Sequence, residues 1–359
     1  MPGLNQRDDC VQGVDTDSAI LLVSEGRDGH RGAYIDLFAR IFDNAGAQAY
    51  VAPRMLRTML RAPVLFDLML EEAPGMFALT ATMRSVMGRP SVALAFRVRE
   101  AATGRTLRLR AKRLGLAALR RMPYVSVLSI VPADVQPEIA PFVRDWIDDP
   151  QCWDVDVDRP IAATPLSRTV LTHARSRAVV VALGGQNEEK GFDRFVSSWI
   201  ADPTLAQRYL FVAAGRVAAA SKDDAERFRA AGGLLFDTLI SDADLFALYD
   251  AADVVWCCYA AQYDQASGIF GRALQFGRPV VVRENAIVER IARREGLPHL
   301  SLADGAPAQV RDLDALRAQA SRSARGIGVA LRHRAAGVLQ RATGLPIARV
   351  IDAAMMSSA

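Results

Sequence analysis

The sequence contains few aromatic residues and few cysteines, and it has no long apolar run. Aromatic residues make up 7% of the 359 positions, whereas hydrophobic residues make up 51%. This balance is typical of an Ala-, Val- and Leu-rich α/β protein. No apolar run approaches the roughly 18 residues needed to span a bilayer, and no signal peptide opens the chain. We therefore expect a cytoplasmic protein without a transmembrane segment.

The sequence also lacks a metal-binding pattern and the two common nucleotide-binding fingerprints. Its four cysteines show no metal-ligand spacing, and the alternating acids at residues 154–158 lie in a predicted linker region rather than after a strand. Neither GxGxxG nor GxxxxGK[ST] is present. We expect a protein that requires no metal ion and no other cofactor.

Two of the cysteines are adjacent. Cys257 and Cys258 fall in a predicted strand, where neighbouring side chains point to opposite faces. They are expected to be small buried hydrophobic groups in a reducing compartment.

The length of the chain and the order of its elements predict an α/β fold with two domains. A chain of 359 residues exceeds one typical core, and in both halves short apolar strands alternate with helices. That alternation indicates parallel sheets covered by helices on both faces. We expect a first Rossmann-like domain at residues 1–165, a second at 166–330, and a C-terminal helix within 331–359 that folds back onto the first domain. The strands predicted in the second half are residues 178–183, 209–213, 233–236, 253–257 and 279–282.

The loop that follows the predicted strand 178–183 has the residues of a phosphate-binding turn. Gly184 and Gly185 permit a tight turn, and Lys190 stands near the start of the next helix. Its ammonium group could neutralise a phosphate. A solvent-exposed lysine without a ligand is the alternative.

A second loop, at residues 263–272, opens a short helix with Ser267, Gly268 and Ile269. The first turn of a helix has unpaired N–H groups and the positive end of the helix dipole, which suit a phosphate. An ordinary α/β turn is the alternative.

Positive charge is concentrated in residues 84–121, which hold eleven Lys or Arg residues and one acid, Glu100. On a helix, one stripe of this segment would consist of Leu107, Ala111, Leu114 and Ala118, flanked by Arg105, Arg108 and Lys112. The pattern favours a helix that lies on an anionic membrane surface. The alternative is a solvated helix whose leucines pack on the sheet. Nucleic-acid binding is a weaker hypothesis for this segment, because no recognition motif or aromatic stacking platform accompanies the charge.

The order of the segments in the second half resembles the donor-binding half of retaining GT-B glycosyltransferases related to family 4. The likeness covers roughly residues 170–300. Four segments carry it in order: the Gly184-x5-Lys190-Gly191 loop, then residues 211–215, 244–255 and 267–282. The resemblance implies a GT-B fold, in which two Rossmann-like domains face each other across a cleft.

The resemblance also assigns roles in the second half. Lys190 matches a lysine that binds the diphosphate of a sugar nucleotide, and the amides of Ser267, Gly268 and Ile269 would hold the leaving diphosphate. Gly184 and Gly185 belong to the same site, although family members usually have an arginine in place of Gly185.

The two acids of the family pattern are only partly kept. Asp264 matches the first acid, which would contact the transferred sugar, and Arg272 replaces the second acid, which would bind the ribose. Arg272 could instead supply the missing positive charge at the phosphates.

In the first half, Gly29-His30-Arg31-Gly32 follows the first predicted strand, where the family places a loop near the donor phosphate and the acceptor. His30, the one histidine of that half, is the second candidate catalytic residue. A structural loop histidine is the alternative.

The resemblance, together with the basic segment, implies a hexosyltransferase of bacterial surface-polysaccharide or exopolysaccharide synthesis. It would move a sugar from a nucleotide-diphosphate sugar, such as a UDP-sugar, to a lipid-linked or oligosaccharide acceptor, with retention. Residues 84–121 would hold it on the inner face of the cell membrane. A GT-B sugar-nucleotide epimerase and a non-catalytic sugar-nucleotide-binding protein are the alternatives, and no nucleic acid is expected.

Overall fold

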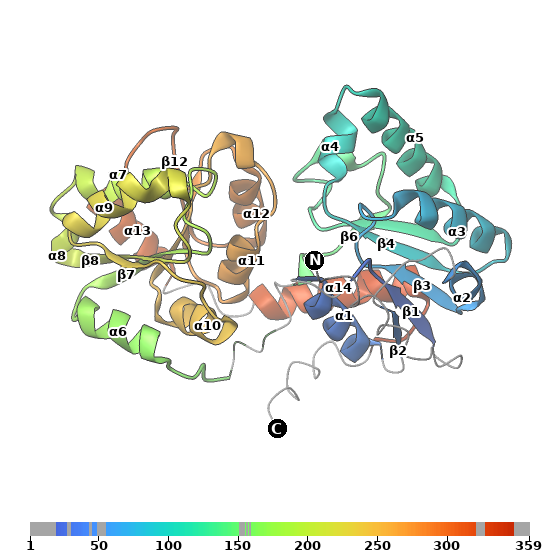
Figure 1. Cartoon of the computed structure of the whole chain (residues 1–359), viewed down its shortest axis with the longest axis horizontal. Helices are drawn as coiled ribbons and strands as arrows, with labels where there is room; N and C mark the ends of the chain where they lie inside the picture. The colour runs from blue at the N-terminus through green and yellow to red at the C-terminus, as the bar shows by residue number, and fades with distance from the viewer. Residues whose placement is uncertain are drawn as a thin grey trace, which may run out of the picture. The chain divides into compact units, whose positions relative to one another are not determined.

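The structure is a computed structural model that describes residues 19–26, 30–42, 45–48, 55–150, 155, 157, 159–320 and 327–347. The chain divides into two compact units (Figure 1). Unit 1 comprises residues 1–150 and 331–359, and unit 2 comprises residues 151–330. Among the described residues, no helix is long and apolar enough to cross a membrane.

Unit 1 contains a parallel sheet with the strand order β2-β1-β3-β4-β5-β6. Strands β1, β3, β4 and β5 are buried along their whole length. Such continuous burial is typical of parallel strands with both faces covered. The strands are β1 (Ile20–Val23), β2 (Ala45–Gln48), β3 (Val64–Asp67), β4 (Ser91–Ala95), β5 (Val125–Ser129) and β6 (Asp145–Trp146).

The helices of unit 1 alternate with these strands. They are α1 (His30–Ile41), α2 (Leu56–Arg61), α3 (Pro74–Val86), α4 (Val98–Thr103), α5 (Leu107–Arg121) and the short η2 (Pro137–Ile139). The last helix, α14 (Ile327–Thr343), belongs to this unit from Leu331 onward. There Arg334 forms an ion pair of 2.7 Å with Asp148.

Unit 2 has a second parallel sheet, with the strand order β12-β11-β10-β7-β8-β9. The order reverses beside β7, so the loops that leave β7 and β10 diverge at a topological switch point, where sheets of this type bind ligands. The strands are β7 (Ala178–Leu183), β8 (Tyr209–Ala214), β9 (Leu234–Phe236), β10 (Val254–Cys257), β11 (Val280–Arg283) and β12 (His299–Leu302).

The helices of unit 2 cover this sheet. They are α6 (Pro165–Ala174), α7 (Phe192–Ala201), α8 (Leu205–Arg208), η4 (Ala219–Ser221), α9 (Lys222–Ala230), α10 (Asp242–Ala251), η5 (Ala261–Tyr263), α11 (Gly268–Gln275), α12 (Ile287–Glu295) and α13 (Val310–Ala320). The α/β class with two parallel Rossmann-like sheets, predicted from the sequence, is confirmed.

One hydrophobic cluster in the core of unit 2 is rich in aromatic residues, which come from α7, α9, β8 and β10. Phe195 of α7 stacks on Phe211 of β8 with ring centroids 4.9 Å apart, and Trp256 of β10 meets Phe195 edge-on at 5.4 Å. Cys257 and Cys258 are buried, as predicted, although β10 ends at Cys257. Burial raises the pKa of Cys257 to about 12 and that of Cys258 to about 11, so both thiols stay protonated.

One arginine of the basic segment is part of the core of unit 1. Arg84 is 0% exposed, and its guanidinium donates to the carbonyl oxygens of Met59 at 2.6 Å, Ala62 at 2.7 Å and Pro90 at 2.7 Å. It also donates to Ser91 Oγ at 3.0 Å. Arg84 is therefore a structural residue and does not contribute to a charged surface, unlike what residues 84–121 as a block predict.

Candidate functional site

The candidate site lies at the carboxyl ends of β7, β8 and β10, and close backbone contacts shape it. Gly215, after β8, has φ +143°, and a Cβ there would lie 1.7 Å from the carbonyl oxygen of Gly184. Gly191 has φ +71°, and a Cβ there would lie 2.0 Å from the carbonyl oxygen of Cys258. Because Gly191 lies against the end of β10, the preceding residue, Lys190, is placed beside the loop that follows β10.

Lys190 reaches the start of α11. Its Nζ lies 3.4 Å from Ser267 Oγ, 3.8 Å from the ring centroid of Tyr263 and 4.8 Å from that of Tyr259. Its backbone N–H donates to Asn187 Oδ1 at 2.9 Å, which orders the loop. A half-buried cation over two aromatic faces is stabilised by the ring quadrupoles and can still contact an anion.

Ser267 is the N-cap residue of α11, but its hydroxyl does not cap the helix. Instead it forms a hydrogen bond of 2.8 Å with Tyr259 and one of 3.4 Å with Lys190. The first bond within the helix runs from Gly271 N–H to the Ser267 carbonyl, and the first turn contains no acid. The N–H groups of Gly268 and Ile269 therefore belong to the unpaired set at a helix start.

Tyr259 and Tyr263 are site residues that the sequence analysis missed. Tyr259 is buried, and burial raises the pKa of its hydroxyl well above the usual value, so it remains a neutral partner of Ser267. The sequence position of Tyr263 could have indicated its place in the site, because it stands four residues before Ser267 in the same loop.

Of the two glycines predicted in the first loop, Gly184 lies close to α11. It has φ +83°, and a Cβ there would lie 3.4 Å from Ile269 Cδ1. Gly185 is exposed, with Asn187 as its near neighbour. The structure thus gathers Gly184, Lys190, Ser267 and Ile269 in one place.

Asp264 contacts another helix. Its Oδ1 accepts from the backbone N–H of Ile287, the first residue of α12, at 2.8 Å, and it lies 3.4 Å from Arg283 Nη2. Arg283 also donates to the carbonyl oxygen of Tyr259 at 3.2 Å. The carboxylate is thereby held at a helix start beside a cation, and a contact with the transferred sugar stays a prediction.

Arg272 lies on α11 but contacts α10. Its Nη1 donates to Gln275 Oε1 at 2.8 Å, and its guanidinium lies 4.9 Å from the ring centroid of Phe246. The role of Arg272 at the phosphates stays a prediction.

His30 is the first residue of α1, and its side chain lies outside the part of the structure that is described. The next residue, Arg31, forms an ion pair of 2.5 Å with Glu72, which follows β3. The role of His30 as a catalytic residue stays a prediction.

A carboxyl group that the sequence analysis missed ends β3. Asp67 is 3% exposed, and burial raises its pKa to about 7, against a backbone hydrogen bond from Met69 at 3.0 Å that lowers it. Glu71 and Glu72 raise the pKa further. Strongly perturbed carboxyls at strand ends are candidates for proton transfer.

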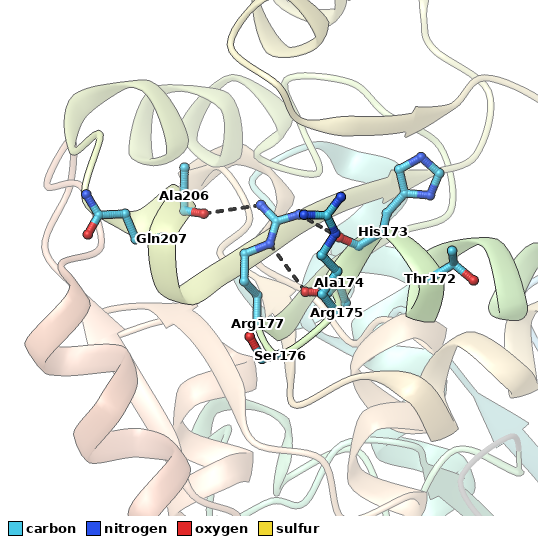
Figure 2. A pocket seen from close by; sticks show the side chains of 8 residues that line it. All are labelled: Thr172, His173, Ala174, Arg175, Ser176, Arg177, Ala206 and Gln207. Carbon is cyan, nitrogen blue, oxygen red and sulfur yellow. Dashed lines mark hydrogen bonds between the residues drawn. The ribbon is translucent and has the colours of Figure 1, made fainter.

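A hollow of about 670 Å³ in unit 2 lies at the opposite, amino ends of β7 and β8 (Figure 2). Figure 2 shows Arg177 turned toward Ala206 and the end of α6. Its guanidinium donates to the carbonyl oxygens of His173 at 2.7 Å and Ala206 at 3.2 Å. Because Arg177 is bonded to the backbone, it holds α6 and α8 together and does not serve as a free anion ligand.

Among the described residues, no group of three or more His, Cys, Asp or Glu residues could hold a metal ion. Independence from metals and other cofactors stays a prediction.

No protein-family model and no curated protein sequence matches this chain. Solved structures do match it. HepE of Anabaena, in complex with UDP, aligns with a TM-score of 0.57 at 13% identity, over 92% of this chain and 96% of that chain. The trehalose-6-phosphate synthase OtsA aligns with a TM-score of 0.55 at 7% identity, over 90% and 99% of the two chains.

A UDP-forming α,α-trehalose-phosphate synthase from Burkholderia xenovorans, in complex with glucose-6-phosphate, aligns with a TM-score of 0.50 at 9% identity, over 94% and 99%. These likenesses confirm the prediction made from motif order: the chain has the fold of the GT-B glycosyltransferases.

Proposed function

We propose that this protein is a glycosyltransferase that moves a hexose from a nucleotide-diphosphate sugar, with a UDP-sugar as the donor. The observation that carries the proposal is the position of the Lys190 ammonium group, 3.4 Å from Ser267 Oγ at the start of α11. A cation and a set of unpaired helical N–H groups meet there at the switch point of the sheet. HepE, which shares the fold, has been solved with UDP and with UDP-glucose.

The chemistry required by transfer suits this arrangement. When the bond between the anomeric carbon and the diphosphate oxygen breaks, negative charge develops on the departing diphosphate. Lys190 and the N–H groups of Gly268 and Ile269 would stabilise that charge more strongly in the transition state than in the bound donor. In a retaining reaction of this kind, the leaving phosphate takes the proton of the acceptor hydroxyl.

The direct test is nucleotide binding by the purified chain. Thermal shifts are measured with UDP, GDP, ADP, TDP and CMP, with their common sugars, and with NAD as a dinucleotide control, because a ligand of the native state raises apparent stability. A selective rise with UDP supports the proposal. A rise with NAD alone, or with none of them, contradicts it.

One observation favours a second candidate, a sugar-nucleotide-binding protein without transferase activity. The carboxylate of Asp264, which the resemblance assigns to the sugar, is engaged by Ile287 N–H and Arg283. Slow release of UDP from UDP-glucose without acceptor supports the transferase, and binding without any turnover supports the second candidate. Release of isomerised UDP-sugar would indicate an epimerase.

We further propose a lipid-linked acceptor at an anionic membrane surface, in surface-polysaccharide synthesis. Support comes from α5, on which Leu107 is 81% and Leu114 is 72% exposed. Leu116 and Leu119 of the same helix pack in the core, so the helix keeps a second apolar stripe outside. Figure 1 shows α3 beside α5, and exposed apolar residues of α3 are Leu79, Met83 and Val86.

The charge on this surface also supports membrane binding. Five cations of residues 84–121 have side chains without a hydrogen bond or ion pair to any described residue: Arg97, Arg105, Arg108, Arg110 and Lys112. Others are engaged with the protein, such as Arg113 with the carbonyl of Ala102 and Arg120 with that of Val143. Free cations beside exposed leucines match the chemistry of an anionic lipid surface.

A further inference from the structure

A groove of about 660 Å³ lies in unit 1, lined by residues of α3 and α5 and by Arg97 and Glu100 at the start of α4. This volume falls in the range of about 300–1,000 Å³ that small-molecule sites occupy. The lining is mainly apolar and includes Leu70, Ala78, Leu109, Leu116 and Leu119.

Two glycines keep the groove open, one on each wall. Gly75 is near the start of α3 and Gly115 is in the middle of α5, and a Cβ on either would meet no atom within 4 Å. Glycine in a helix interior is less favourable than alanine, so Gly115 weakens α5 locally. A larger residue at either position would project into open space and fill the groove.

Cations stand at the rim of the apolar groove. Arg97, Arg108 and Lys112 line it, and none of their side chains bonds or ion-pairs with a residue that the structure describes. Two acids also line the groove: Glu71, whose Oε1 accepts from the N–H groups of Phe96 and Arg97, and Glu100 in the first turn of α4, so the three cations outnumber the acids. The rim therefore suits an anionic head group.

The groove connects two features of unit 1. Ala111 lines it and also belongs to the exposed stripe of Leu107 and Leu114 on α5. Leu70 and Arg97, at the other side, follow β3 and β4, so the groove reaches the carboxyl edge of the sheet, where ligands of parallel sheets bind.

We propose that this groove binds the isoprenoid phosphate of a lipid-linked acceptor. The chain lies along Leu109 and Leu116, and the phosphate is held by Arg108 and Lys112. The sugar attached to that phosphate is then held at the carboxyl edge of the sheet. This inference rests on the proposed glycosyltransferase function and names the chemical class of its acceptor.

The test measures binding of farnesyl phosphate to the full chain by calorimetry, with farnesol and inorganic phosphate as partial probes. Wild type is expected to bind farnesyl phosphate at least tenfold more tightly than either partial probe. Gly115→Leu should lose binding by tenfold or more while remaining folded, since leucine favours helix over glycine. Gly75→Leu provides the same test from the opposite wall.

The charge test uses a matched control on the same helix. Arg108→Gln with Lys112→Gln should weaken farnesyl phosphate binding tenfold or more. Arg110→Gln removes a cation of α5 that is exposed like Arg108 but does not line the groove, and it should leave binding unchanged.

UDP binding is measured in the same samples, so that the two proposals can fail separately. If wild type binds UDP but not farnesyl phosphate, or if both leucine variants bind farnesyl phosphate like wild type, the groove proposal is overturned. If farnesyl phosphate binds as expected but no nucleotide does, the glycosyltransferase proposal fails instead. If Gly115→Leu loses sedimentation with phosphatidylglycerol vesicles to the same extent, the groove is part of a general lipid surface and the proposal is overturned.

Discussion

The ammonium nitrogen of Lys190 lies 3.4 Å from the hydroxyl oxygen of Ser267, although 77 residues separate the two in the chain. The pair joins the loop after β7 to the helix after β10, across the point where the strand order of the sheet reverses. The contact depends on the close approach of Gly191 to Cys258. A phosphate held by Lys190 would therefore also meet the first turn of α11.

Replacing Lys190 by Met is expected to weaken UDP binding ten- to hundredfold. A charge-assisted contact with phosphate contributes roughly 1.5–3 kcal/mol, and methionine keeps the length of the side chain without the charge. Calorimetric titration with UDP measures the change. Lys222→Met removes an exposed lysine of the same unit and serves as the control. Equal affinities in the two variants would remove Lys190 from the site.

Asp264 can be tested with two substitutions, because a structural and a chemical role respond differently. Asp264→Ala removes the acceptor for Ile287 N–H and should cost about 1 kcal/mol of unfolding free energy. Asp264→Asn keeps an acceptor oxygen for that N–H group and loses only the charge beside Arg283, so it should cost less stability than Asp264→Ala. If the carboxylate acts on the sugar, the Asn variant loses turnover far more than UDP affinity. An Asn variant with normal turnover would leave Asp264 with the structural role alone.

Asp67 should make the stability of the protein depend on pH. Its pKa is raised from 3.8 to about 7 by burial, so the folded state holds its proton more tightly than the unfolded state. As pH rises from about 4 to about 7, the unfolded state loses this proton first, and the free energy of unfolding falls. The rise in the pKa of Asp67 from 3.8 to about 7 corresponds to at most about 4 kcal/mol of unfolding free energy.

Asp67→Asn cannot ionise and should lack this decline. Urea denaturation at pH 5 and pH 8 measures the change in unfolding free energy between the two pH values. Relative to wild type, the variant should be more stable at pH 8 than at pH 5. Parallel behaviour of the two proteins at both pH values would show that Asp67 titrates as an ordinary carboxyl.

Arg84→Lys should destabilise the protein by about 3 kcal/mol or more. Lysine offers one ammonium group where the guanidinium serves the carbonyls of Met59, Ala62 and Pro90 in different directions, and a buried acceptor left unpaired costs about 1–3 kcal/mol. Chemical denaturation gives the difference. Arg121→Lys, on an exposed arginine, should change stability by less than about 0.5 kcal/mol. Comparable effects of the two would contradict the structural role of Arg84.

Neutralising Arg108, Arg110 and Lys112 together should reduce sedimentation with phosphatidylglycerol vesicles. Each cation near an anionic bilayer contributes about 1 kcal/mol, so the triple Gln variant should bind roughly a hundredfold more weakly. A triple Gln variant of the exposed residues Lys222, Arg227 and Arg229 in unit 2 is the control. Equal sedimentation of the two variants would leave α5 as ordinary surface.

Much of the fold of unit 2 could be predicted, because buried parallel strands are continuous apolar runs. The predicted strand at residues 178–183 coincides with β7, and the one at 209–213 is one residue shorter than β8. The edge strand β12, with the sequence HLSL, was missed, since two of its four residues are polar and its pairing partner β11 decides its conformation. Residues 53–90 are harder to interpret from the sequence, and α3 in this stretch includes the buried Arg84, which interrupts the apolar pattern of its buried face.

The loops that form the candidate site could be predicted from the sequence, but the contacts between their side chains could not. Turn and helix-start chemistry singled out Gly184, Lys190 and Ser267, because those signals are local. The aromatic rings of Tyr259 and Tyr263 beneath Lys190, and the pairing of Asp264 with Arg283, join segments that meet only in the folded sheet.

The sequence by itself determined the alternation of strands and helices and the places where glycine, serine and lysine mark a phosphate-binding turn. These properties depend on periodicity and on backbone chemistry within a few residues. The tertiary structure decided which charges are available. Arg84 and Arg108 are both arginines of the same basic segment. The guanidinium of Arg84 is buried among carbonyl groups, whereas Arg108 is exposed at the rim of a groove. Burial depends on what distant segments pack around a side chain, and no local pattern contains that information.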